Sequence, residues 1–92
     1  MEEKSKELAK CEVGWWRAHH EKDYEKVVEL MTREYELMFG ADKEKARKAV
    51  MLRVEAAKMH DKAESTEGEE SEMYWKKAEE LIFQHFKVIL GD

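Results

Sequence analysis

One stretch of the chain decides the fold, and it reads ARKAVMLRVEAAKMHDKA at residues 46–63. Its alanines and valines recur every three or four residues, which is the period of an α-helix with one buried face. Asp42 stands just before it, where its side chain can cap the first turn. We therefore predict a helix over residues 43–64 whose apolar face packs against other helices.

Three further segments show the same period, over residues 3–20, 24–39 and 70–90. Asp23 is a candidate N-cap, and Gly40 and Gly91 are candidate helix ends. Thr66 and Glu69 have the spacing of a capping box ahead of the last segment.

The first two segments are separated only by residues 21–23, which contain neither glycine nor proline. The apolar stripe nevertheless turns by roughly 90° across this junction, which favours a tight turn over one continuous helix. We predict a single all-α domain over residues 1–92, an antiparallel up-down-up-down four-helix bundle built from two αα-hairpins.

The composition excludes several classes of function. The 92 residues are 42% hydrophobic and 42% charged, which suits one small core and a Lys/Glu-rich surface of the kind common in proteins from hot environments. A net charge of −5 without a basic cluster argues against nucleic acid as a partner. Cys11 has no second cysteine to pair with, so a reducing compartment is expected. With a charged start and no membrane-length apolar run, we expect a cytoplasmic protein without a membrane partner.

Six ionisable side chains fall on the predicted apolar faces, where burial costs stability unless each finds a partner. They are Glu12, His19, Glu34, Arg53, His60 and His85. In the predicted bundle the two glutamates and the arginine lie at mid-height, His19 and His60 lie toward one end, and His85 lies toward the other. We expect a buried network in which Arg53 bridges Glu12 and Glu34 and fixes helix register.

Two other interpretations use the same residues. Imidazoles and carboxylates on facing helices can hold a metal or a small ligand. However, the Glu-x-x-His spacing of di-iron bundles is absent, and Arg53 would repel a cation. We therefore predict no bound metal and no cofactor.

The spacing Arg53-x6-His60 resembles that of HEPN-type ribonucleases, which are small all-helical dimers. The resemblance implies metal-independent RNA cleavage, with Arg53 stabilising charge on the phosphate and His60 moving protons.

The last helical segment carries more apolar residues than one core stripe needs. Phe83 and Leu90 lie two turns apart, flanked by Phe86 and Trp75. Exposed apolar surface of this kind marks a partner site, and a two-fold copy of the same chain is the simplest partner. The sequence therefore favours a small non-catalytic binding or assembly module that forms a homodimer, with another protein as an alternative partner.

Overall fold

The computed structural model describes residues 2–91 and contains four α-helices, with no strand in that range. They are α1 (Glu2–His20), α2 (Tyr24–Phe39), α3 (Lys43–Glu64) and α4 (Gly68–Leu90). The second and third have the bounds predicted from the sequence, and the first and last begin slightly earlier than predicted. The all-α class with four helices is confirmed.

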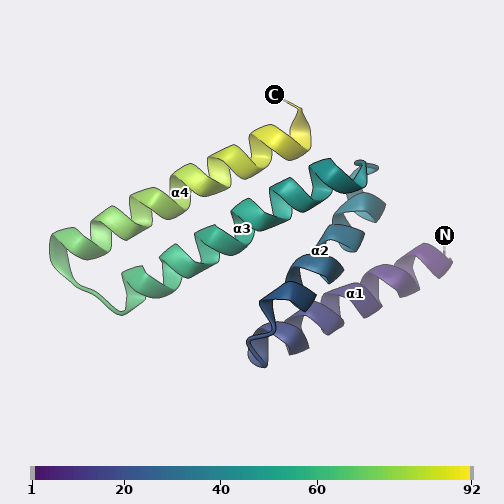
Figure 1. Ribbon diagram of the computed structural model, residues 1–92, viewed down its shortest axis with the longest axis horizontal. Coiled ribbons are helices and arrows are strands. Elements are labelled where there is room, and N and C mark those ends of the chain that lie inside the picture. Colours follow the sequence, from purple (N-terminus) through teal and green to yellow (C-terminus); the bar gives the residue numbers. More distant parts are fainter. Residues whose placement is uncertain (1, 92) are drawn as a thin grey trace.

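The helices pack in their order along the chain. The main contacts join α1 to α2, α2 to α3 and α3 to α4. Figure 1 shows α3 and α4 side by side along most of their length, with α1 and α4 on opposite sides of the molecule. The overall shape is flat, with extents of 47 × 33 × 19 Å. The contact between α1 and α4 that would close a bundle is not among the main contacts.

Both aspartate caps predicted from the sequence are confirmed. The backbone N–H of Lys26 donates to Asp23 at 3.3 Å, and that of Lys45 donates to Asp42 at 2.9 Å. Gly40 ends α2 in the left-handed conformation, with φ of 64°. These local signals explain why the bounds of α2 and α3 could be read from the sequence.

The predicted capping box at the start of α4 is wrong. The Thr66 hydroxyl donates to the carbonyl of Lys62 at 2.8 Å, so it completes the end of α3 instead. The N-cap residue of α4 is Glu67, whose side chain makes no capping hydrogen bond. A threonine can serve the helix on either side of it, and the spacing to Glu69 does not say which.

The tight turn between α1 and α2 is confirmed, and it has an uncommon residue at its centre. Lys22 adopts the left-handed conformation, with φ of 61°. Its N–H donates to the carbonyl of His19 at 3.0 Å, and the N–H of Asp23 donates to that of Ala18 at 2.8 Å. This pair of bonds is a Schellman motif, in which glycine usually occupies the position of Lys22.

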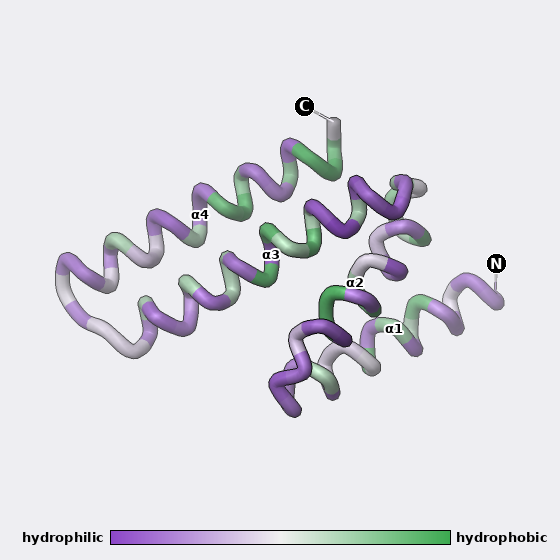
Figure 2. Tube along the Cα trace, in the orientation of Figure 1, coloured by the Kyte–Doolittle hydropathy of each residue, from purple (hydrophilic) through white to green (hydrophobic). Residues whose placement is uncertain are grey.

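The core is small and lies where α2, α3 and the end of α4 meet. Its centre is formed by Ala46, Ala49 and Val50, all fully buried. Figure 2 shows hydrophobic residues on α2, in the middle of α3 and in the C-terminal half of α4. Within the part of the chain that the structure describes, no helix has an apolar stretch that could cross a bilayer.

Candidate functional site

A chain of polar contacts crosses all four helices, and two neighbouring residues of α2 carry it. Glu34 contacts Trp15 of α1, whereas Tyr35 contacts Arg53 of α3 and His85 of α4. Consecutive residues of a helix project about 100° apart, so one turn of α2 can serve partners on two sides. We call these contacts the polar relay.

On the α1 side of the relay, the carboxyl groups of Glu12 and Glu34 accept hydrogen bonds from the same donor. The indole N–H of Trp15 donates to Glu12 at 2.9 Å and to Glu34 at 3.1 Å. Glu34 is only 6% exposed. Burial raises its pKa, as do the negative charge of Glu12 and hydrogen bonding with it. These effects outweigh the opposing influence of Trp15 and Arg53, so Glu34 holds a proton more readily than an exposed glutamate.

On the other side, the Tyr35 hydroxyl joins two partners. Nη1 of Arg53 donates to its oxygen at 3.2 Å, and Nε2 of His85 lies 2.7 Å from it. Arginine can only donate, so the tyrosine proton is free to point at Nε2, which assigns the ring proton of His85 to Nδ1. That Nδ1 is buried and has no hydrogen-bond partner within residues 2–91.

The environment keeps His85 neutral and Tyr35 protonated. His85 is 1% exposed, and burial lowers its pKa, with a smaller contribution from the charge of Arg53. Burial also raises the pKa of Tyr35, more than Arg53 lowers it. Around physiological pH, Arg53 is therefore the one residue of the relay that carries a positive charge.

The six predicted network residues differ in how deeply the structure buries them. Glu34 and His85 are buried and Glu12 is half-buried, whereas His19, Arg53 and His60 are exposed. The prediction that these last three point into the core is wrong. Because each helix packs mainly on its neighbours in sequence, the faces that a closed bundle would cover remain open.

The predicted contacts among these residues also change. Arg53 makes no ion pair with either glutamate within 4.0 Å among the described residues, and Trp15 joins the two glutamates instead. His19 packs edge to face on Tyr24, with ring centroids 6.2 Å apart. His60 packs on Trp75 of α4 at 5.0 Å. The two histidines that we expected to share a layer thus have separate partners.

Trp15 and Tyr35 are central to the site but were assigned to the apolar stripes by sequence periodicity. A signal for each was present. Glu12 and Trp15 are one helix turn apart, and a buried tyrosine hydroxyl usually finds a polar partner, which His85 on a facing stripe could supply. Periodicity counts such side chains as hydrophobic and overlooks their polar ends.

Within residues 2–91, one group of side chains has donor atoms close enough to hold a metal. His60, Asp61 and Glu64 offer ligand atoms within 4.8 Å of one another, all from one exposed turn of α3. The imidazole Nδ1 lies 3.3 Å from Glu64 and 3.7 Å from Asp61, distances that an ordinary ion pair also explains. The absence of a bound metal stays a prediction.

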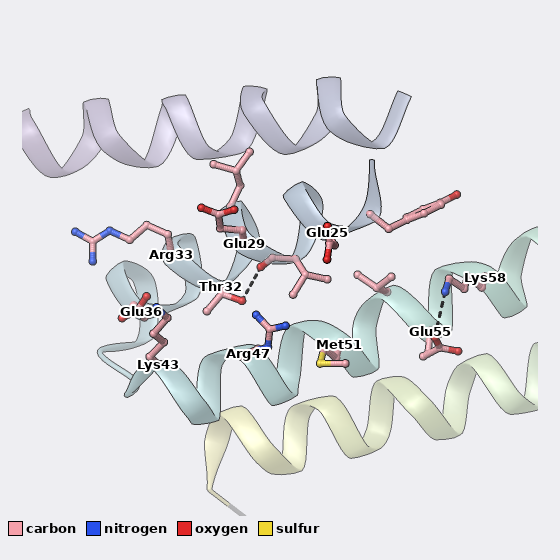
Figure 3. A pocket seen from close by; sticks show the side chains of 14 residues that line it. Glu25, Glu29, Thr32, Arg33, Glu36, Lys43, Arg47, Met51, Glu55 and Lys58 are labelled. Atoms are coloured by element: carbon pink, nitrogen blue, oxygen red, sulfur yellow. Dashed lines mark hydrogen bonds and ion pairs between the residues drawn. The ribbon is translucent and has the colours of Figure 1, made fainter. Parts of the chain in front are cut away.

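A broad groove runs between α2 and α3, with a volume of about 820 Å³. Figure 3 shows Glu25, Glu29 and Glu36 on its α2 side. The α3 side carries Lys43, Arg47, Glu55 and Lys58. We call it the α2–α3 groove. Charges of both signs lie on both sides of the groove, because Arg33 also belongs to its α2 side.

Arg53 and His60 have partners on different helices. Nη1 of Arg53 donates to Tyr35 of α2, whereas the ring of His60 packs on Trp75 of α4. This separation gives no support to a shared ribonuclease centre. No protein-family model matches the chain, and neither curated proteins nor solved structures give a match.

Proposed function

We propose that this protein is a small non-catalytic binding and assembly module that acts as a cytoplasmic homodimer. The observation that supports the proposal is the outer face of α4. Phe83, Phe86 and Leu90 follow one another at helical spacing and are 54%, 46% and 61% exposed. We call these three residues the α4 patch. Large apolar side chains grouped in this way favour association because burying them releases ordered water.

One residue of the α4 patch, Phe86, contacts a buried side chain. The ring of Phe86 packs on buried His85 at 4.6 Å, and His85 packs on Tyr35 at 5.6 Å. Tyr35 in turn contacts the half-exposed Phe39 at 5.2 Å. Aromatic side chains held in place lose little entropy on binding, which is why they dominate interface energetics. Trp75, also exposed, extends the apolar character of α4 toward its other end.

A homodimer would also reconcile the open arrangement of the helices with the bundle predicted from the sequence. In this proposal α1–α2 and α3–α4 are two antiparallel αα-hairpins arranged up-down-up-down, and the partner covers the side of α4 that α3 leaves open. A helix in a four-helix bundle has two neighbours, whereas α4 has one main neighbour within the chain. Two-fold symmetry lets the same patch serve both subunits.

The decisive experiment is a mass measurement by light scattering over a concentration series. We expect twice the chain mass of 11.0 kDa for the wild type at micromolar concentration. Phe83→Glu should return a monomer because it places a charge in a desolvated contact. Met51→Glu is the matched control, since Met51 is similarly exposed but lies on α3.

The two chains repel each other electrostatically, which gives an independent check. Each carries a net charge of −5, so added salt should strengthen the dimer by screening the repulsion. A wild-type monomer at all concentrations and salt levels contradicts the homodimer. A dimer that Met51→Glu disrupts and Phe83→Glu leaves intact contradicts the assignment to α4.

A further inference from the structure

A second, smaller pocket lies between α1, α2 and α3 and has a volume of about 240 Å³. Val27 and Met31 of α2 form its apolar floor. Trp15 of α1 lines one side and Arg53 of α3 the other, so we call it the Trp15–Arg53 pocket. The main packing contacts do not join α1 to α3, which leaves this space over α2 open.

Arg53 presents donors to this pocket in a fixed position. One guanidinium N–H is used by Tyr35, whose hydroxyl is itself held by His85. No carboxylate lies within ion-pair distance of Arg53 in the described part of the chain. Its remaining donors form the planar fork that binds a carboxylate through two hydrogen bonds.

The opposite wall is a held aromatic ring. The indole N–H of Trp15 is bound to both Glu12 and Glu34, and its ring packs edge to face against Trp16 with centroids 6.3 Å apart. A tryptophan ring fixed at its edge offers its remaining surface for contact with a flat ligand. The pocket thus combines an aromatic wall, an aliphatic floor and a cationic end.

We propose that the Trp15–Arg53 pocket binds a small aromatic monocarboxylate. The carboxylate contacts Arg53, and the ring lies over Val27 and Met31 against Trp15. The volume is below the roughly 300 Å³ of pockets for drug-sized ligands, which limits the ligand to one ring. Asp61 also lines the pocket, about 12 Å along α3 from Arg53, and disfavours a second acidic group.

The test is an NMR titration of the ¹⁵N-labelled protein with phenylacetate, followed at the indole N–H of Trp15. Phenylacetamide is the matched ligand, because it has the same ring and nearly the same shape without the charge. We expect saturable shifts with phenylacetate and at least tenfold weaker binding of the amide. Equal affinities, or shifts that never saturate, overturn the proposal.

Three variants locate the site. Arg53→Gln should weaken phenylacetate binding at least tenfold by removing the charged fork. Ala57→Leu should weaken it similarly by filling the pocket while leaving Arg53 in place, which keeps the test valid even if Arg53→Gln alters the fold. Arg47→Gln is the control, since Arg47 lines the α2–α3 groove and not this pocket.

Wild-type affinity in Ala57→Leu overturns the proposed position, and so does a loss of affinity in Arg47→Gln equal to that in Arg53→Gln. This inference does not depend on the homodimer, because none of the pocket residues belongs to the α4 patch. A monomeric wild type that binds phenylacetate would contradict the proposed function and support the pocket.

Discussion

The hydroxyl of Tyr35 lies 2.7 Å from Nε2 of His85, and this one hydrogen bond joins α2 to α4. These two helices are not among the pairs with extensive packing, so the bond ties together parts of the molecule that are otherwise connected through α3. The ring of Tyr35 also contacts that of exposed Phe39, and the ring of His85 contacts that of exposed Phe86. A change at Tyr35 therefore bears both on stability and on the surface proposed for assembly.

Removing the Tyr35 hydroxyl should destabilise the fold. In Tyr35→Phe, Nε2 of His85 joins Nδ1 as a second buried nitrogen without a partner, which should cost about 1–3 kcal/mol of unfolding free energy. Urea denaturation at pH 7 measures it. Tyr24→Phe is the control, since Tyr24 is exposed and should change stability by less than about 0.5 kcal/mol. Replacing His85 by leucine in the Tyr35→Phe background should recover part of the loss, because both polar partners are then absent.

His85 should make the protein less stable as the solution becomes mildly acidic. Its pKa in the folded state is lowered from 6.5, so the unfolded chain binds a proton more readily than the folded one. Stability is fully present above pH 6.5 and falls as the pH drops below that value. Unfolding free energies measured at intervals between pH 8 and pH 5 should show the decline. In His85→Gln, which keeps a group able to bond Tyr35 but does not titrate, the decline should be shallower.

The contribution of Glu34 to stability should change with pH in the opposite direction, and at lower pH. Its pKa in the folded state is raised from 4.5, so the folded chain binds a proton more readily than the unfolded one. As the pH rises from 4.5 through the raised pKa, the buried side chain loses its proton and the free energy of unfolding falls. At pH 7, Glu34→Gln should therefore be more stable than the wild type, with the difference vanishing in acid. Glu29→Gln is the control, because it removes an exposed carboxylate from the same helix.

The turn between α1 and α2 offers a direct route to a more stable protein. Lys22 is held at φ of 61°, which costs a residue with a side chain about 1–2 kcal/mol and glycine almost nothing. Part of that gain is offset because glycine is freer in the unfolded chain. Lys22→Gly should raise the unfolding free energy by about 0.5–1 kcal/mol in urea denaturation. Lys22→Ala retains the Cβ atom, and an equal gain from it would show that the side-chain charge is responsible instead.

The protein as purified should contain no stoichiometric transition metal. His60, Asp61 and Glu64 are exposed and come from a single turn, which leaves most of a metal's coordination to water. Elemental analysis after dialysis checks this expectation. About one zinc, iron or manganese per chain, lost in His60→Gln, would contradict it.

The helices were largely predictable because their signals are local. Asp23, Asp42 and Gly40 each act on the turn next to them, and the structure uses all three as expected. The turn at Lys22 could be located from the change in direction of the apolar stripe. The capping role of Thr66 could not, because the same side chain fits the end of α3 and the start of α4.

The site was harder to predict because it depends on which faces are covered. Periodicity placed Arg53 and His60 on an inward face, but that face is inward only if α1 and α4 close over it. It also treated Tyr35 and Trp15 as plain apolar residues, although their hydroxyl and indole N–H connect the buried carboxyl and imidazole groups. Glu34 and His85 were identified correctly as buried because each lies on a helix face that packs against its neighbour in sequence.

The packing of each helix on the next has a consequence for how the chain acquires its shape. Contacts between nearby segments form quickly, since little of the chain must be brought together to make them. As synthesis proceeds, α2 can settle on α1, and α3 on α2, before α4 has been made. The hydrogen bond from Tyr35 to His85 can form only after α4 has been made, so it follows the contacts among α1, α2 and α3.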